Sequence, residues 1–281
     1  MRTAVVTDST AYLPSYIRKE LNIHMIPLSV TLDGEVYDEE IDISATDFYN
    51  KVRGENSLPK TSQPPIGRFV ELFESLKEEY DAVISIHLSG GISGTFAGAI
   101  QAGDMVDDLS VHAFDSEISC YLQGFYVIRA AQLANEGAAP GVIMDELNEM
   151  KTSMRAYFMV DDLTHLQRGG RLSAAQALIG GLLQVKPLLH FQEKVIVPFE
   201  KIRTRKKAMK RIADMLAEDA ETMLLEAVII HGNRPDDAKV WLTELSERLP
   251  NVQFTISHFG PVIGTHLGEG AMGLGWVKRK V

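Results

Sequence analysis

The stretch Asp81-Ala-Val-Ile-Ser-Ile-His-Leu88 is an apolar run of strand length, and the interpretation of the first half of the chain begins there. Such a run, bounded by polar residues, is typical of a buried strand. A glycine-rich loop, Ser89 to Thr95, follows it and leads into a helix. The same order of strand, polar loop and helix starts at Ala4–Val6 and again at Ser110–Phe114. This alternation predicts a parallel sheet with helices on both faces, an α/β fold of three layers.

Polar residues follow these strands at the point where each one ends. Asp8 and Ser9 come after the first strand, and Asp115 and Ser116 come after the third. Ligands of parallel sheets gather at the carboxyl ends of the strands. A binding site is therefore expected near these segments and the loop 89–95.

Hydrophobic periodicity and capping residues predict the other elements. Expected helices cover 13–20, 46–52, 66–77, 95–105, 119–136, 140–151, 203–217 and 235–249. Expected strands cover 25–32, 157–160, 185–190, 195–199, 225–231 and 252–258. Asp33-Gly34 is a hairpin signal before a short strand, and 58–65, with three prolines, is expected to be a loop.

The second half of the sequence mixes hairpins and crossovers, so its sheet is expected to be mixed. A chain of 281 residues fits two ordinary domains. We place the boundary near residue 155. Residues 1–155 would form an N-terminal parallel α/β domain, and 156–281 a C-terminal α/β domain with a mixed sheet.

Composition excludes several classes of protein. The chain has 28 basic and 38 acidic residues, a net charge of −10, which argues against an electrostatic nucleic-acid binder. A single cysteine, Cys120, rules out an internal disulfide framework and favours a reduced, cytoplasmic protein. Neither a signal peptide nor an apolar run of membrane-spanning length is seen, so no stable membrane insertion is expected. The eight histidines lack metal-ligand spacing, so no metal is expected.

The stretch Phe259 to Gly273 contains five glycines and one histidine, His266. Glycines permit close approach of the backbone, which suggests a tight loop closing on a ligand. Taken alone, the stretch is better explained as a glycine-rich loop into the last strand, with a half-buried His266. Two earlier segments, around Ser62 and Ser93, supply the matching half of a small anion site.

Those two segments carry neutral hydrogen-bond donors. Ser93 or Thr95 can cap a helix whose first-turn amides attract an anion. Thr61, Ser62 and the amide of Gln63 can serve one small oxyanion, in a loop that prolines stiffen. Both segments are equally explained as ordinary helix N-caps, and both explanations stay open at this point.

Two basic segments are also candidates. Arg168-Gly-Gly-Arg171 can clamp a phosphate or carboxylate, or can be a surface turn paired with Asp161 or Asp162. The run Lys201 to Lys207 reverses the local charge of an acidic protein. It can face a phosphate or an acidic partner, or it can be a solvated helix start.

Eight motifs together resemble those of the DegV family, in the same order and across the whole chain. They are Asp8-Ser-Thr-Ala-Tyr-Leu-Pro14, Thr61-Ser-Gln-Pro64, Leu88 with Ser93-Gly-Thr95, Asp115-Ser116, Leu166-Gln-Arg-Gly-Gly-Arg171, Leu183-Gln-Val-Lys-Pro-Leu188, Arg203-Thr-Arg-Lys-Lys-Ala208 and Gly264-Thr-His-Leu-Gly268. The family consists of bacterial fatty-acid-binding proteins, including the binding subunits of the fatty acid kinase. This sequence departs from the family at Glu269, where proline is common.

The resemblance implies two α/β domains with a long-chain fatty acid between them and no cofactor. It assigns the carboxylate ligands to Thr61, Ser62, Ser93 and His266. The runs 97–100 and 174–183 would line the tunnel for the acyl chain. The protein would catalyse nothing itself and would present the carboxylate to a partner kinase, which forms an acyl phosphate. The arginines that face the partner or the phosphate would be Arg171, Arg203 and Arg205, and transient membrane contact is compatible with this role.

Two alternatives stay open beside the carrier. A Ser/His lipid hydrolase would use Ser93 as nucleophile and His266 as base, with Asp8 or Asp115 to orient the imidazole. A regulatory lipid sensor would bind the fatty acid without delivering it.

Overall fold

The computed structural model describes residues 2–53, 59–172 and 186–280. The chain divides into two compact units. The first unit consists of Met1–Ile43 and Pro59–Thr152, and the second of Ser44–Leu58 and Ser153–Val281. A single boundary near residue 155 does not account for the segment 44–58, which belongs to the second unit; the limits of the domains stay a prediction.

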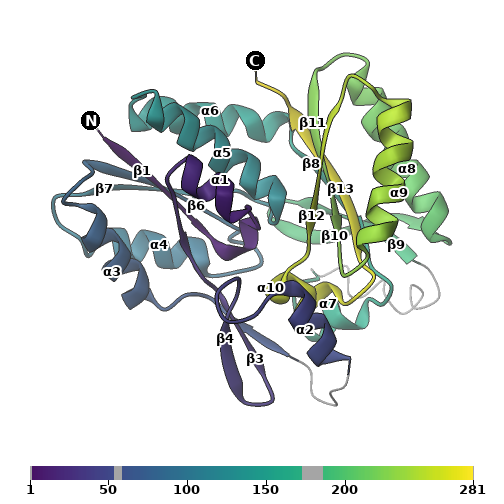
Figure 1. The fold of residues 1–281 in the computed structure, drawn as a ribbon, viewed down its shortest axis with the longest axis horizontal. Coiled ribbons are helices and arrows are strands. Elements are labelled where there is room, and N and C mark those ends of the chain that lie inside the picture. The colour runs from purple at the N-terminus through teal and green to yellow at the C-terminus, as the bar shows by residue number, and fades with distance from the viewer. Residues whose placement is uncertain (1, 54–58, 173–185, 281) are drawn as a thin grey trace. The chain divides into compact units, whose positions relative to one another are not determined.

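The first unit is built on four parallel strands in the order β2-β1-β6-β7. Its elements are β1 (Thr3–Asp8), η1 (Ser9–Ala11), α1 (Ser15–Glu20), β2 (Ile23–Ile26), β3 (Ser29–Leu32), β4 (Glu35–Asp38), β5 (Lys60–Ser62), α3 (Ile66–Leu76), β6 (Ala82–His87), α4 (Thr95–Gly103), β7 (Ser110–Asp115), α5 (Tyr121–Asn135) and α6 (Pro140–Ser153). Helices α3 and α4 lie on one face of this sheet, and α5 lies on the other (Figure 1). The predicted three-layer α/β/α arrangement is confirmed.

Burial follows the alternation of side chains along the strands. Ala4 and Val6 on β1 face the helices α3 and α4, where they pack with Phe69 and Phe73. Both phenylalanines are fully buried. Full burial of such a side chain contributes about 1.5–3 kcal/mol, so this face anchors α3 firmly against the sheet.

Two predictions in the first unit are wrong. The expected strand 25–32 is two strands, β2 and β3, which belong to different sheets. Pro27 stands between them, and proline cannot donate a ladder hydrogen bond. The expected loop 58–65 contains β5, whose Ser62 and Thr61 pair with Ser29 and Val30 of β3. The predicted hairpin at 33–34 is confirmed, since β3 and β4 are antiparallel neighbours.

The second unit is built on a mixed sheet of six strands in the order β10-β9-β8-β13-β11-β12. Its elements are α2 (Ala45–Val52), β8 (Arg155–Met159), α7 (Thr164–Arg168), β9 (Lys186–Gln192), β10 (Val195–Ile202), α8 (Arg205–Ala220), β11 (Leu225–His231), α9 (Pro235–Arg248), β12 (Gln253–His258), α10 (Pro261–Leu267) and β13 (Met272–Lys278). β11 and β12 are parallel, and the other neighbours are antiparallel. The predicted mixed sheet is confirmed.

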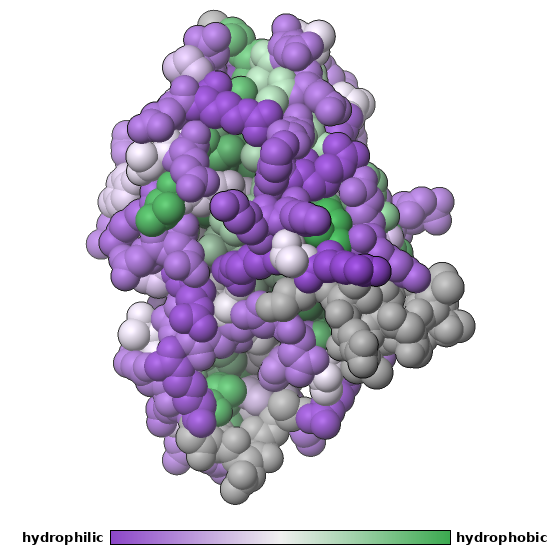
Figure 2. All heavy atoms as spheres, turned by 90° about the vertical axis from the view of Figure 1, so that its right-hand side faces the viewer, coloured by the Kyte–Doolittle hydropathy of each residue, from purple (hydrophilic) through white to green (hydrophobic). Residues whose placement is uncertain are grey.

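Helices α8 and α9 bury their apolar sides against this sheet. Ile212 and Leu216 of α8 and Trp241 of α9 join Trp276 of β13 in one core. Figure 2 shows the side of the chain where α8 and α9 lie, and its surface there is mainly hydrophilic. No helix in the described part of the chain is long and apolar enough to span a bilayer.

The glycine-rich stretch 259–273 is not only a loop, because it contains the helix α10. Pro261 occupies the first turn, where its missing N–H costs nothing and its fixed φ suits a helix. Gly268 ends the helix with φ 76°. Of the two predicted tunnel-lining runs, 174–183 lies outside the described residues, and 97–100 lies on α4.

Candidate functional site

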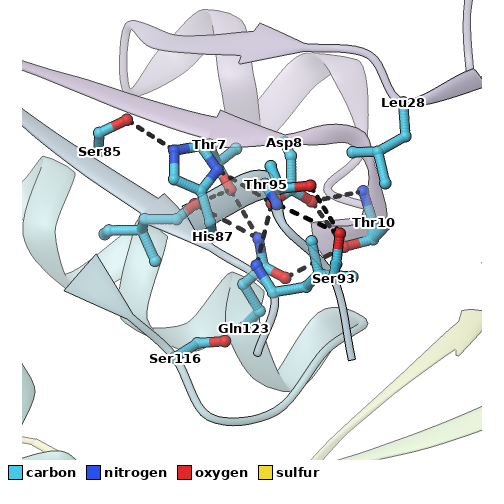
Figure 3. Close-up of polar contacts among 12 residues, drawn as sticks. Thr7, Asp8, Thr10, Leu28, Ser85, His87, Ser93, Thr95, Ser116 and Gln123 are labelled. Carbon is cyan, nitrogen blue, oxygen red and sulfur yellow. Dashed lines mark hydrogen bonds and ion pairs between the residues drawn. The ribbon is translucent and has the colours of Figure 1, made fainter. Parts of the chain in front are cut away.

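Asp8, at the carboxyl end of β1, is the centre of a buried polar network (Figure 3). Its Oδ1 accepts hydrogen bonds from the backbone N–H of Thr10 at 3.0 Å and from the Thr10 hydroxyl at 2.6 Å. Its Oδ2 accepts from the backbone N–H of Leu88 at 3.0 Å and lies 3.0 Å from Nδ1 of His87. Because a carboxylate only accepts, Nδ1 of His87 carries the proton. Asp8 thereby ties β1 to the start of the loop that follows β6.

Ser85, His87 and Asp8 have the order of a hydrolase triad. Ser85 Oγ lies 2.7 Å from Nε2 of His87, whose other ring nitrogen meets Asp8. All three side chains are wholly buried, and the ring of Phe69 packs edge-on against His87 at 5.3 Å. A nucleophile needs access to its substrate. We therefore interpret this chain of hydrogen bonds as structural support for the loop.

A second carboxylate holds the middle of the same loop. Asp115, at the end of β7, accepts hydrogen bonds through Oδ1 from the N–H groups of Gly90 at 3.1 Å and Glu117 at 3.0 Å. The loop is thus held at Leu88 and at Gly90 by carboxylates at the ends of β1 and β7, the strands on either side of β6. Ser93 follows on this loop and is partly exposed.

The hydroxyl residues of the two segments do not occupy the N-cap positions of the helices that follow them. Gly94 and Pro65 occupy the N-cap positions of α4 and α3, and neither makes a side-chain cap bond. Ser93 Oγ lies 2.9 Å from the Thr95 hydroxyl and accepts from the Thr95 N–H at 3.3 Å. Thr61 and Ser62 lie on β5. The three predicted hydroxyl ligands therefore share the first unit, and none of them is an N-cap.

His266 lies on α10 in the second unit, packed against the end of α7. A Cβ on Gly169 would lie 2.2 Å from Nδ1 of His266, so only glycine permits this close approach. Arg171, two residues on, donates from Nη1 to the carbonyl of Gly169 at 2.5 Å. The structure therefore brings His266 and the predicted Arg171 to one place.

Burial, together with the smaller effects of the charges of Arg171 and His165, lowers the pKa of His266 from its ordinary 6.5 to about 4. His266 is therefore neutral at pH 7. A neutral imidazole can donate one N–H and accept at its other nitrogen.

This lowered pKa predicts how stability depends on pH. Between about pH 6.5 and pH 4 the unfolded chain binds a proton at His266 that the folded chain does not, so the folded state loses stability as pH falls through this window. We expect the melting temperature to fall from pH 7.5 to pH 5, and to fall less in His266→Gln. Equal pH dependence in the two proteins would contradict the assignment. His231, whose pKa burial also lowers to about 4, adds to the same trend in both proteins.

The two predicted arginines of the basic run differ. Arg205 donates from Nη1 to the carbonyl of Gly270 at 2.6 Å, and it forms ion pairs with Asp161 at 3.7 Å and Asp237 at 3.9 Å. It holds the loop that follows α10. Arg203 is exposed and forms no ion pair within the described residues.

Comparison with known proteins covers the whole chain. A family model described as "Uncharacterised protein, DegV family" matches residues 2–279. The chain belongs to the DegV family. Protein DegV of Bacillus subtilis is 60% identical over 278 residues, which are 98% of this chain and 99% of that protein.

Solved DegV structures have the same fold. The crystal structure of DegV from Bacillus subtilis, a fatty acid binding protein, is similar with a TM-score of 0.96 and 58% identity, over 99% of this chain and 100% of the other. A DegV family protein from Thermus thermophilus, described for its fatty acid binding, has a TM-score of 0.90 and 32% identity over 99% and 100% of the two chains. Both of these DegV proteins are described as binding a fatty acid.

Glu269, which departs from the DegV motif, forms an ion pair in this structure. The Glu269 carboxylate binds the guanidinium of Arg53, with Nε and Oε2 2.8 Å apart and Nη2 bound to Oε1. Asn233 also donates to Oε1 at 3.0 Å. Arg53 follows α2, whose Tyr49 hydroxyl donates to the carbonyl of Phe259 at 2.9 Å. In this DegV chain, Tyr49 and Arg53 at α2 and Asn233 between β11 and α9 hold the residues on either side of α10, the helix that carries His266.

Sequence reasoning missed several residues of this DegV site. No local pattern links His87 to Asp8, because the two residues are 79 apart in sequence. His165 and Gly169 had no local signal for contact with α10. The placement of Asp8 and Asp115 after strands was the one available signal, and the structure confirms that both lie beside the loop of Ser93.

Proposed function

We propose that this protein binds a long-chain fatty acid between its two domains and holds the carboxylate with Thr61, Ser62, Ser93 and His266. The observation that supports this most strongly is the similarity, over 99% of the chain, to a solved DegV protein described as fatty-acid-binding. The geometry agrees with it: three hydroxyl residues outside the N-cap positions occupy one unit, and a neutral histidine occupies the other.

Neutral donors suit a buried carboxylate. A charge removed from water must find hydrogen bonds, and bonds to an ionised group are worth about 1.5–3 kcal/mol each. Hydroxyl and imidazole N–H groups provide them without neutralising the charge. The carboxylate stays ionised and can act as a nucleophile toward a phosphate donor.

The acyl chain supplies the affinity. Burial of each methylene contributes roughly 0.8 kcal/mol, so a chain of about sixteen carbons contributes on the order of ten kcal/mol before the costs of association. No covalent attachment and no cofactor is needed to retain such a ligand. The specificity for a carboxylic acid would come from the hydroxyls and His266.

We further propose that the protein works in the bacterial cytoplasm as the binding subunit of a separate kinase. That kinase would transfer a phosphoryl group from its own donor to the bound carboxylate, which gives an acyl phosphate. Arg171 and Arg203 would face the kinase or the phosphate. Arg205, which already holds the carbonyl of Gly270, would act by positioning the loop after His266.

An Arg203→Glu variant tests the delivery step. We expect acyl phosphate formation by a cognate kinase to fall about tenfold or more. The variant replaces the exposed guanidinium by a negative carboxylate, which repels the phosphate. Affinity for oleate should not change. Lys210→Glu is the matched control, since Lys210 pairs with Asp214 on its own helix. Equal loss in both variants would contradict a specific role for Arg203, and no phosphorylation of oleate with the unaltered protein would favour the non-delivering sensor.

No described contact favours the hydrolase alternative. The imidazole partner of Asp8 is His87, and Asp115 binds the backbone N–H groups of Gly90, in the loop after β6, and of Glu117. The hydroxyl of Ser93 meets Thr95 rather than an imidazole within its unit. Release of label from an activated acyl ester, dependent on Ser93, would reopen this alternative.

A further inference from the structure

Gln63 connects the two hydroxyl-bearing segments of the first unit. It directly follows Ser62 on the chain, and its side chain lies against Gly94, which directly follows Ser93. A Cβ on Gly94 would lie 2.1 Å from Oε1 of Gln63 and 3.2 Å from its Nε2. The amide therefore occupies the space that any other residue at position 94 would need.

The glycine at position 94 leaves room for this contact, and its negative φ lies outside the left-handed region that favours glycine. Gly94 has φ −81° and ψ 4°, which most residues adopt without strain. Gly98 lies one turn later on the same face of α4, where a Cβ would lie 3.8 Å from Nε2 of Gln63 and 3.7 Å from the ring of Phe69. Gly94 and Gly98 thus leave a shallow depression on α4, here called the seat, for the side chain of Gln63 at the corner between β5 and α3.

We propose that Gln63 is a positioning residue of the carboxylate site: its amide, seated on Gly94 and Gly98, holds Thr61 and Ser62 in register with Ser93. The inference rests on the proposed function and deepens it. Thr61 and Ser62 come from a three-residue strand, and Ser93 comes from a loop. Hydrogen bonds to one carboxylate require both segments to keep a fixed separation, and a site loses affinity when its supporting contacts are loose.

The seat makes a specific prediction about paired substitutions. Gln63→Ala removes the amide, and Gly94→Ala displaces it, because the new Cβ takes the place of Oε1. Each single variant is expected to weaken oleate binding about tenfold, the loss of about one hydrogen bond to a charged group. In the Gln63→Ala background, Gly94→Ala has nothing left to displace. The double variant should therefore bind oleate as the Gln63→Ala variant does.

The experiment measures oleate and oleyl alcohol affinity by displacement of a fluorescent fatty acid, together with the melting temperature. Gly67→Ala is the matched control, because a Cβ there meets nothing within 4 Å. We expect unchanged melting temperatures, near-normal affinity for the alcohol, and non-additive loss for oleate. Additive losses, equal losses for acid and alcohol, or full affinity in Gly94→Ala would overturn the proposal. If the unaltered protein binds no oleate, the proposed function itself fails.

Discussion

Asp8→Ala is expected to reduce the free energy of unfolding by about 3–5 kcal/mol. The substitution leaves the buried N–H groups of Thr10 and Leu88 without their acceptor, and it removes the carboxylate that fixes the proton on His87. Each orphaned buried donor costs about 1–3 kcal/mol. The loss would be measured as a shift of the denaturant midpoint, with Asp107→Ala as an exposed carboxylate control in the same unit.

The same variant also separates two roles of the network. If Asp8 only supports the loop of Ser93, the folded fraction of Asp8→Ala should lose oleate affinity together with stability, and Ser85→Ala should do so more mildly. Hydrolytic turnover that depends on Ser85 would contradict our structural interpretation of Ser85, His87 and Asp8. An unchanged denaturant midpoint in Asp8→Ala would show that the four hydrogen bonds contribute little.

Combined substitution Ser93→Ala with His266→Ala is expected to weaken oleate binding by at least about a hundredfold. Two hydrogen bonds to a charged group are lost, each worth about 1.5–3 kcal/mol, and tenfold in affinity is about 1.4 kcal/mol. The matched control is Ser110→Ala with His112→Ala, a second serine and histidine whose side chains lie 2.9 Å apart on β7. Isothermal titration calorimetry with oleate measures the affinity of both double variants.

Affinity for a ligand of the same length without a carboxylate sharpens that comparison. Oleyl alcohol gains the same apolar burial, so its affinity should depend far less on Ser93 and His266. Equal loss of affinity for oleate in the site variant and in the control variant would remove these two residues from the carboxylate site.

Local sequence patterns predicted most of the elements correctly. Apolar runs identified β1, β6 and β7 of the parallel sheet, and Asp33-Gly34 identified the hairpin between β3 and β4. Ser44, a residue type that favours this position, caps α2 through its hydroxyl oxygen, which accepts from the N–H of Asp47 at 3.1 Å. These features depend on residues close in sequence, so their signals can be read without the fold.

The errors occurred where distant residues decide the structure. β5 has three residues beside prolines, and it is a strand only because β3 offers it a partner. Five glycines in 259–273 concealed α10, although Pro261 is a typical first-turn residue. The segment 44–58 carries no local signal that it belongs to the second unit.

The candidate site could be predicted only in part for the same reason. Periodicity and strand ends placed Asp8, Asp115 and the loop 89–95 near a site. The choice of Thr61, Ser93 and His266 as carboxylate ligands came from the resemblance to a family, and it stays a prediction. The contacts that support these residues, such as His87 with Asp8 and Gln63 with Gly94, join segments too far apart in sequence for any local pattern to reveal.

The measurement that tests the central claim most directly is native mass spectrometry of the freshly purified protein, followed by denaturing extraction. We expect a co-purified mass that matches a fatty acid of about fourteen to eighteen carbons, a chain whose burial supplies roughly the affinity argued above. That result would also give the chain preference. An empty protein that takes up neither added oleate nor palmitate would contradict the fatty-acid-binding account.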